Sequence, residues 1–327
     1  MRAIIVDNPG GPEQLRIGEV QRPEPKPHEL LVKVKAASVN RADILQRQGN
    51  YPPPPSTSEI LGLDAAGVVV DKGDQVLAWE NDERVMALVP GGGYAEYVTI
   101  PEQMALPIPD NLSFTDAASI PEAFLTAYQA IVWYGQLKKR ETALIHAGAS
   151  GVGTAAIQLA RTIGAKIIVT AGSDEKVNFC EMLGADLGVN YKEDDFATAV
   201  RNFTQGKGAD VIVDFIGADY WDRNMASLAV DGRIVILATL GGALIEQFNI
   251  RDLFKKRGQL TTSSLRSRPL DYKVRLTRDF GGFALPRFNS GELKPVIDSV
   301  YSWQMAVEAH NHMEANANKG KIVLTID

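Results

Sequence analysis

The segment that most restricts the fold of this chain is a glycine-rich turn, His146-Ala147-Gly148-Ala149-Ser150-Gly151-Val152-Gly153. Residues 142–146 before it read as a buried strand, and residues 154–161 after it have the apolar spacing of a helix. Glycines let the backbone approach a phosphate closely, and the start of a helix offers free N–H groups and a positive dipole end. The turn therefore predicts an α/β domain that binds a nucleotide.

The glycine spacing is Gly-x-x-Gly-x-Gly rather than the usual Gly-x-Gly-x-x-Gly, and a glycine cluster alone also fits an ordinary tight turn. Its context favours the nucleotide site, because strands alternate with helices from about Pro121 onward. Six strands are expected, at residues 142–146, 166–170, 188–191, 211–215, 233–238 and 259–263. This number fills a Rossmann doubly wound parallel sheet, which we predict for residues 121–265.

The first third of the chain has the character of an all-β domain. Residues 31–36 alternate apolar and polar side chains, and residues 68–70, 84–89 and 94–98 read as further short strands. Residues 1–120 therefore predict an antiparallel, barrel-like domain. Residues 266–327, with a helix near 303–315 and a strand at 321–326, are expected to return to it.

The end of the second sheet strand indicates which nicotinamide cofactor binds. Proteins that bind NAD usually carry an acidic residue about 20 residues after the glycines, where it bonds the ribose 2′-hydroxyl. Here the small residues Gly172 and Ser173 take that place, and Lys176 follows one helical turn later. We therefore predict NADPH rather than NADH, although Asp174 and Glu175 beside them count against a 2′-phosphate.

Composition excludes several other classes of protein. The 40 acidic and 34 basic side chains give a net charge of -6, which disfavours nucleic acid as a partner. Cys180 is the one cysteine, so neither an internal disulfide nor a cysteine-rich zinc site is expected; it reads as a packed helix residue. The N-terminus lacks a signal-peptide core and the apolar run at 234–245 is too short to span a bilayer, so we expect a cytoplasmic protein without membrane contact.

Together with the glycine turn, several short segments resemble those of a known family. They are residues 36–43, 47–52, 61–64, 87–97, 263–268 and 313–316. The chain resembles the zinc-free quinone oxidoreductase branch of the medium-chain dehydrogenase/reductases, within it the tumour-suppressor-inducible type. Residues 77–85 depart from the family's Gly-Asp-Arg-Val ending, which puts the shape of that loop in doubt.

The resemblance implies a GroES-like β-barrel catalytic domain split around the NADPH-binding domain, a homodimer, and a small-molecule acceptor such as a quinone. It also implies a set of cofactor contacts. These are Asn40, Thr126, Gly148, Ser150, Gly151, Val152, Gly153, Gly172, Ser173, Lys176, Tyr191, Gly217, Leu240, Gly241, Gly242, Ser263, Leu265 and Asn316.

No metal site is expected. Zinc-dependent members of the superfamily carry a cysteine and a Gly-His-Glu where this chain has Ser38 and Gly62-Leu63-Asp64. Catalytic zinc needs three N, O or S ligands and an open position. The four histidines, at positions 28, 146, 310 and 312, do not cluster in the sequence, and 310 and 312 would point to different sides of a helix. His146 reads as a buried residue that satisfies local hydrogen bonds.

Without a metal, we expect direct hydride transfer from NADPH to a quinone, whose carbonyl groups are already electron-poor. The sequence offers two catalytic candidates, each with an alternative structural role. Tyr51 is either an aromatic wall and hydroxyl donor at the substrate, or packs against the prolines beside it. Asn40 either orients the nicotinamide or the acceptor, or forms a turn. An enoyl-thioester or enone reductase, and a non-catalytic NADPH-binding redox sensor or structural protein, remain alternatives. The sequence leaves the physiological acceptor, the proton donor and one- or two-electron transfer open.

Overall fold

The computed structural model describes residues 1–327, which form two compact units. Unit 1 comprises Met1–Leu125 and Arg266–Asp327, and unit 2 comprises Thr126–Leu265. None of the helices combines the length and the apolar character that crossing a membrane requires.

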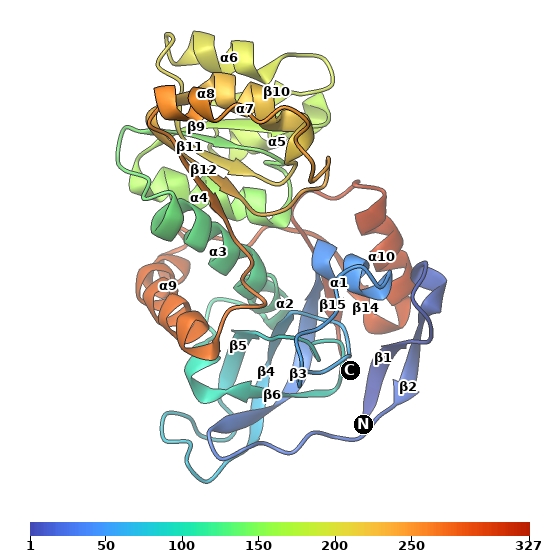
Figure 1. The fold of residues 1–327 in the computed structure, drawn as a ribbon. Helices are drawn as coiled ribbons and strands as arrows, with labels where there is room; N and C mark the ends of the chain where they lie inside the picture. Colours follow the sequence, from blue (N-terminus) through green and yellow to red (C-terminus); the bar gives the residue numbers. More distant parts are fainter. The chain divides into compact units, whose positions relative to one another are not determined.

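Unit 2 is a six-stranded parallel sheet with strand order β10-β9-β8-β11-β12-β13 (Figure 1). Its strands are β8 Thr142–Ile145, β9 Lys166–Ala171, β10 Leu187–Asn190, β11 Ala209–Asp214, β12 Leu228–Ile236 and β13 Gln259–Thr262. This is the order of a Rossmann sheet, in which the order of strand addition reverses between the two central strands, β8 and β11. The predicted doubly wound sheet is confirmed, and each strand lies within a few residues of its expected position.

Helices connect these strands. They are α3 Pro121–Tyr128, which begins in unit 1, the π-helix Gln129–Tyr134, α4 Gly151–Ile163, α5 Asp174–Leu183, α6 Phe196–Phe203, the 3-10 turn Ala218–Tyr220, α7 Trp221–Ser227 and α8 Ile250–Lys255. The sheet side chains Leu144, Ile168, Ile212 and Ile234 form one core cluster with Phe196 of α6 and Met225 of α7. Residues from separate βα units thus share one apolar layer.

Unit 1 is built on a seven-stranded sheet and a separate hairpin. The sheet has the order β14-β15-β3-β4-β5-β7, and β6 pairs with β3. Its strands are β3 Glu29–Val39, β4 Asp64–Lys72, β5 Arg84–Leu88, β6 Tyr97–Pro101, β7 Leu106–Pro107, β14 Ile297–Ser302 and β15 Lys321–Thr325; the hairpin is β1 Arg2–Val6 with β2 Leu15–Glu19. Because β15 pairs with β3, the C-terminal segment completes the sheet that the N-terminal segment begins. Only β14 and β15 run parallel.

The helices of unit 1 are α1 Arg41–Arg47, α2 Phe114–Ala118, α9 Leu270–Ser290 and α10 Ala306–Glu314, with 3-10 turns at Pro12–Gln14, Glu102–Met104 and Trp303–Met305. The sequence did not predict the long helix α9. Its side chains Phe280 and Phe288 are fully buried and pack around Phe124.

One predicted strand is wrong in position. The expected strand at residues 94–98 is β6, which begins only at Tyr97. Tyr94 lies in the preceding turn, where its N–H donates to the Leu61 carbonyl at 3.0 Å and its own carbonyl accepts from Ile4 at 2.8 Å. Since Tyr94 is fully buried, the apolar alternation there reflects a turn packed into the core.

Candidate functional site

The glycine turn of unit 2 joins β8 to α4 and has little room for side chains. A Cβ atom on Gly153 would lie 2.3 Å from the Ala147 carbonyl oxygen, and one on Gly148 would lie 2.8 Å from Cβ of Val169. Ser150 caps α4, its Oγ accepting the Gly153 N–H at 3.0 Å. The first N–H groups of a helix have no carbonyl partner within that helix. The turn therefore has the form of an anion cradle.

The candidate residues after β9 and β10 lie together. A Cβ on Gly172 would come within 2.9 Å of the Tyr191 hydroxyl, so the two are in contact. Ser173 caps α5 and accepts the Lys176 N–H at 3.3 Å. Asp174, the acid that counted against NADPH, accepts a hydrogen bond from the Asn190 side chain at 2.9 Å. Its carboxylate is thus engaged by the end of β10.

The remaining candidates of unit 2 follow the other strands. Gly217, with φ +83°, comes after β11, and the Ala218 N–H beside it donates to the Gly242 carbonyl at 2.9 Å. Leu240 and Gly241 donate backbone hydrogen bonds to the segment after β11, at 3.1 and 2.8 Å. Ser263 follows β13 and its hydroxyl bonds the buried Gln129 side chain. Thr126 and Leu265 are the first and last residues of the unit.

Nearly all the cofactor candidates of unit 2 therefore follow the carboxyl ends of its parallel strands. In open α/β sheets this edge, at the point where strand order reverses, is where ligands bind. The structure brings these candidates to one edge of the sheet; their contact with NADPH stays a prediction.

His146 comes directly after β8, and its side chain contacts other residues of the unit's interior. Its ring is fully buried, Nε2 lying 2.7 Å from Oδ1 of Asn224 and Nδ1 2.9 Å from Oγ1 of Thr170. Because the Asn224 amide nitrogen donates to Asp214, its Oδ1 accepts from Nε2–H, and Nδ1 accepts from the threonine. Burial lowers the pKa of His146 to about 4. The ring is a neutral structural group, as predicted.

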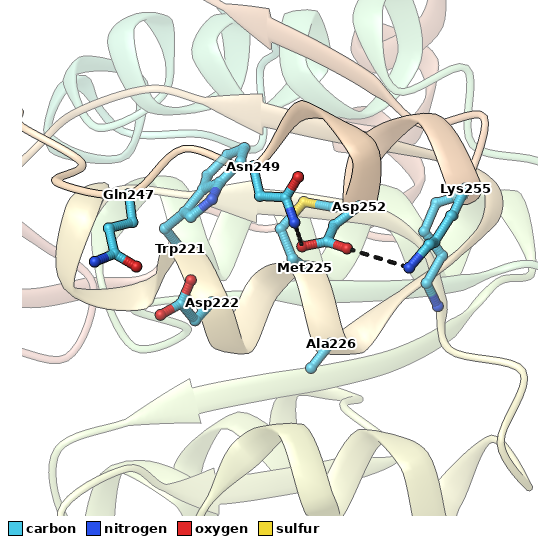
Figure 2. A pocket seen from close by; sticks show the side chains of 9 residues that line it. Trp221, Asp222, Met225, Ala226, Gln247, Asn249, Asp252 and Lys255 are labelled. Atoms are coloured by element: carbon cyan, nitrogen blue, oxygen red, sulfur yellow. Dashed lines mark hydrogen bonds and ion pairs between the residues drawn. The ribbon is translucent and has the colours of Figure 1, made fainter.

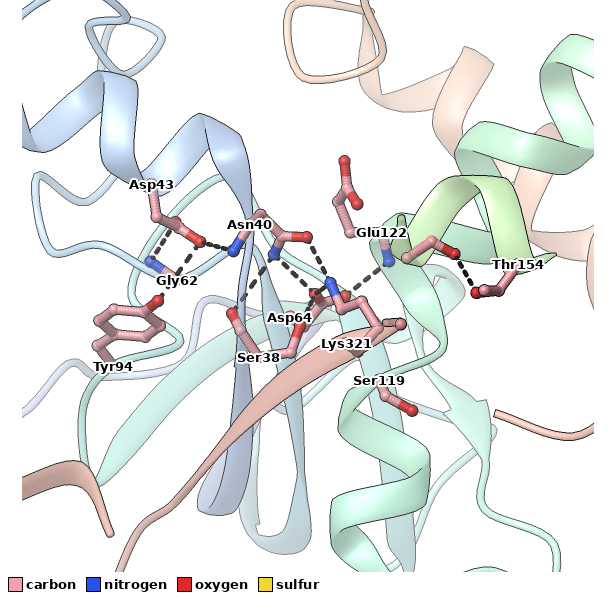
Figure 3. Close-up of polar contacts among 12 residues, drawn as sticks. Ser38, Asn40, Asp43, Gly62, Asp64, Tyr94, Ser119, Glu122, Thr154 and Lys321 are labelled. Carbon is pink, nitrogen blue, oxygen red and sulfur yellow. Dashed lines mark hydrogen bonds and ion pairs between the residues drawn. The ribbon is translucent and has the colours of Figure 1, made fainter. Parts of the chain in front are cut away.

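Unit 1 holds a buried polar cluster, shown in Figure 3, that joins the ends of three strands, β3, β4 and β15, and the starts of two helices, α1 and α3. Asp64 is its centre: one oxygen accepts from Asn40 Nδ2 at 2.9 Å, from Lys321 Nζ at 3.3 Å and from the Ser38 hydroxyl. Its other oxygen accepts the Glu122 N–H at 2.6 Å. The side chains of Asp64 and Lys321 are 0% and 5% exposed. The cluster is a self-satisfied network with an ammonium as its cation.

Asn40 is the residue at which α1 begins, its N-cap. Its backbone N–H donates to Asp43 Oδ2 at 2.8 Å, as one half of the capping box of α1, and its amide oxygen accepts from Lys321. With its amide nitrogen shared between Asp64 and the Ser38 carbonyl, the side chain is held in one orientation. Any contact of Asn40 with a nicotinamide or an acceptor stays a prediction.

A second chain of hydrogen bonds runs behind α1. Arg47, fully buried, donates to Nδ1 of His310 at 3.1 Å, and the Tyr94 hydroxyl lies 3.3 Å from Nε2 of that ring and 3.5 Å from Asp43. Arg47 also pairs with Glu314 at 2.7 Å. Burial, followed by Arg47, lowers the pKa of His310 to about 3, and burial raises the pKa of Asp43 to about 6. These groups fix the position of α1.

Tyr51, the other catalytic candidate, is held by an arginine. The guanidinium of Arg266 lies 5.2 Å from the centre of the Tyr51 ring, and its nitrogens donate to the Pro90 carbonyl at 2.8 Å and to Gln46 at 2.6 Å. Burial lowers the pKa of Arg266. Arg266 is thus anchored by these bonds and lies over the Tyr51 ring. Asn316, by contrast, lies at the end of α10 with its side-chain oxygen 2.6 Å from Arg41.

No group of three or more His, Cys, Asp or Glu side chains is placed to hold a metal ion. Where zinc-dependent relatives carry a cysteine and a Gly-His-Glu, this chain has Ser38, whose hydroxyl donates to Asp64, and Asp64, which also accepts from Lys321. His310 and His312 face different partners, Arg47 and Tyr301. Zinc therefore does not fit the residues present.

Sequence reasoning missed Lys321, Arg266 and Glu122. The signal for the first was a lysine at the start of an otherwise apolar strand, where a charge needs a buried partner. Nothing in the sequence points to the partners themselves.

Unit 2 also has a pocket of about 390 Å³ beside α7 and α8, lined by Trp221, Met225, Asp252 and Lys255 among others (Figure 2). It was not predicted either.

Comparisons with known proteins agree with this arrangement. Residues 26–110 match the alcohol dehydrogenase GroES-like domain, and residues 151–278 match the family described as zinc-binding dehydrogenase. The chain is 31% identical to a quinone oxidoreductase of Rattus norvegicus over 329 residues, covering 100% of this chain and 98% of the relative. The chain belongs to the quinone oxidoreductase branch of the medium-chain dehydrogenase/reductases.

Solved structures of this superfamily match the whole chain. A quinone oxidoreductase of Pseudomonas syringae is 30% identical with a TM-score of 0.89 and 99% coverage of both chains. A mycobacterial protein solved with NADPH is also 30% identical, with a TM-score of 0.89 and 100% coverage of both. Similar structures include an NAD-dependent alcohol dehydrogenase, 34% identical, and the CurK enoyl reductase, 25% identical. The predicted family and fold are confirmed, and the chain is an oxidoreductase that uses a nicotinamide cofactor.

Proposed function

We propose that this member of the quinone oxidoreductase branch reduces a quinone with NADPH and without zinc. The observation that carries the proposal is the buried cluster of unit 1, in which the Lys321 ammonium is the cation beside Asp64. A lysine at this place satisfies the carboxylate and the Asn40 amide together, and leaves no set of ligands for a metal. An electron-poor quinone needs little help from a Lewis acid.

The choice of NADPH rests on the end of β9. No acidic residue stands at Gly172 and Ser173, Lys176 supplies a positive charge on the next turn, and Asp174 is engaged by Asn190. The mycobacterial structure solved with NADPH supports this choice, and the NAD-dependent alcohol dehydrogenase speaks for the alternative. The cofactor contacts expected from the sequence are retained as part of this proposal.

The bound nicotinamide supplies the hydride, and this chain's residues supply position and a dry surface. Tyr51, with its ring fixed by Arg266, forms an apolar wall suited to a flat aromatic acceptor. Asn40 is a positioning residue, because Asp64 and Lys321 hold its amide in one orientation.

A homodimer is the proposed assembly. Strand β13 is an edge of the parallel sheet, and the segment leading to it exposes large apolar side chains: Leu244 is 88%, Ile250 69% and Phe254 81% exposed. An unpaired strand edge beside apolar side chains is suited to pairing with an identical copy. Sedimentation should therefore give a mass twice that of one chain, and the Phe254→Glu variant should have the mass of a single chain.

An enone or enoyl-thioester reductase is the second candidate, favoured by the structural likeness to the CurK enoyl reductase. Steady-state oxidation of NADPH should be compared with 1,4-benzoquinone, a larger ortho-quinone and a crotonyl thioester as acceptors. Turnover with quinones and little with the thioester supports the proposal. Turnover with the thioester alone supports the enoyl reductase, and NADPH binding without any turnover supports a binding protein.

A further inference from the structure

Glu122 differs from the other acidic groups of the polar cluster. Its backbone N–H, at the start of α3, donates to Asp64, but its carboxyl group has no hydrogen-bond partner, and the residue as a whole is half-buried. Figure 3 shows that carboxyl group directed away from Asp64 and Lys321, outside the network of dashed lines. The cluster thus fixes the backbone of Glu122, while the carboxyl group is not engaged in a hydrogen bond that would compete with proton transfer.

The surroundings of Glu122 favour a protonated carboxyl group near neutral pH. Burial raises its pKa to about 7, the positive charge of Lys321 on β15 opposes this rise, and the negative charges of Asp64 on β4 and Asp43 on α1 add to it. An acid whose pKa lies near the working pH can both give up and regain a proton during turnover.

The other acids of unit 1 near this point are less suited to proton transfer. The oxygens of Asp43 accept from the Asn40 and Gly62 N–H groups, at 2.8 and 3.0 Å, and its side chain is fully buried. Tyr94 is also fully buried, and its pKa is raised well above the ordinary value by burial and by Asp43. His310 is buried and held neutral between Arg47 and Tyr94.

We propose that Glu122 is a catalytic residue that gives the proton completing the reduction of the acceptor. This inference rests on the proposed function. Hydride transfer delivers two electrons and one hydrogen to the quinone, which becomes a hydroquinone monoanion. The O–H bond of Glu122 then breaks as a new O–H bond forms on that anion, whose phenolic oxygen is the stronger base. The Glu122 carboxylate regains its proton from water.

The test compares wild type with Glu122→Gln, which keeps the shape and a hydrogen-bond donor but cannot transfer a proton, and with Glu122→Asp. Glu19→Gln, on the exposed end of the β1–β2 hairpin, is the matched control. The kcat for 1,4-benzoquinone is measured from pH 5.5 to 9, together with the solvent isotope effect, the Kd for NADPH and the melting temperature.

Wild type should lose kcat tenfold per pH unit above about pH 7. Glu122→Gln should have a kcat about 10²-fold lower at pH 7, no such decline and an unchanged Kd for NADPH, while Glu122→Asp should restore part of the activity and its decline. An unchanged kcat and pH profile in a folded Glu122→Gln would overturn the role of Glu122. Absence of quinone turnover in wild type would overturn the proposed function and this inference together.

Discussion

Removing one member of the buried Asp64–Lys321 pair should destabilise unit 1 strongly. An ion left unpaired in the interior costs about 3–5 kcal/mol. Lys321→Met leaves Asp64 with hydrogen bonds from Ser38, Asn40 and the Glu122 N–H, so we expect the lower end, about 3 kcal/mol. Asp64→Asn removes the negative charge beside Lys321 and leaves its ammonium with the neutral Asn40 amide oxygen as a partner. We therefore expect a larger loss of folding free energy, about 4–5 kcal/mol.

The double variant Asp64→Asn/Lys321→Met separates pairing from packing. With both charges gone, it should be more stable than either single variant, and the interaction energy should exceed about 2 kcal/mol. Thermal unfolding measures this as a fall in Tm of about 2–4 °C for each kcal/mol in a domain of this size. The control Glu80→Gln removes an exposed carboxylate from Lys72 and should shift the Tm by less than about 4 °C. Additive losses in the double variant would refute the pairing.

Substitutions and titrations in unit 2 test the nucleotide site and the buried histidine. Gly153→Ala should abolish NADPH binding in titrations, because its Cβ meets the Ala147 carbonyl at 2.3 Å, whereas Gly282→Ala in α9 meets nothing within 4 Å and should be neutral or stabilising. Lys176→Ala should weaken NADPH binding about tenfold and leave NADH binding unchanged, and equal losses would contradict the cofactor choice. His146 should keep a neutral ring in NMR titrations down to about pH 5. Because its folded pKa of about 4 lies below the ordinary value of about 6.5, its contribution to stability is full above about pH 6.5 and falls as the pH drops toward 4.

The sequence predicts the nucleotide unit well because its signals are local. The strand, glycine turn and helix of residues 142–161 are contiguous, and the parallel sheet brings the residues after each strand to one edge whatever the details of packing. The predicted start of β6 was three residues too early. Tyr94 is buried because it lies in a turn packed into the core, and the alternation pattern of the sequence does not distinguish this from a strand.

The polar cluster could not be predicted in the same way. Asn40 and Lys321 lie 281 residues apart, and Ser38, Asp64 and Glu122 come from three further positions on β3, β4 and α3. Only the pairing of β15 with β3, and of β3 with β4, brings them together. The residue types at positions 38 and 64 were enough to predict that zinc ligands are missing there. They could not show that Lys321, near the far end of the chain, bonds Asp64.

The most direct test of the account is NADPH oxidation by chelator-treated protein with 1,4-benzoquinone, using NADPH deuterated at the transferred position of C4. Metal-free hydride transfer from NADPH predicts that turnover survives chelation, exceeds turnover with NADH, and slows when the deuterated cofactor is used under single-turnover conditions. Activity that disappears on chelation and returns with zinc, or no oxidation of bound NADPH by any quinone, would contradict it.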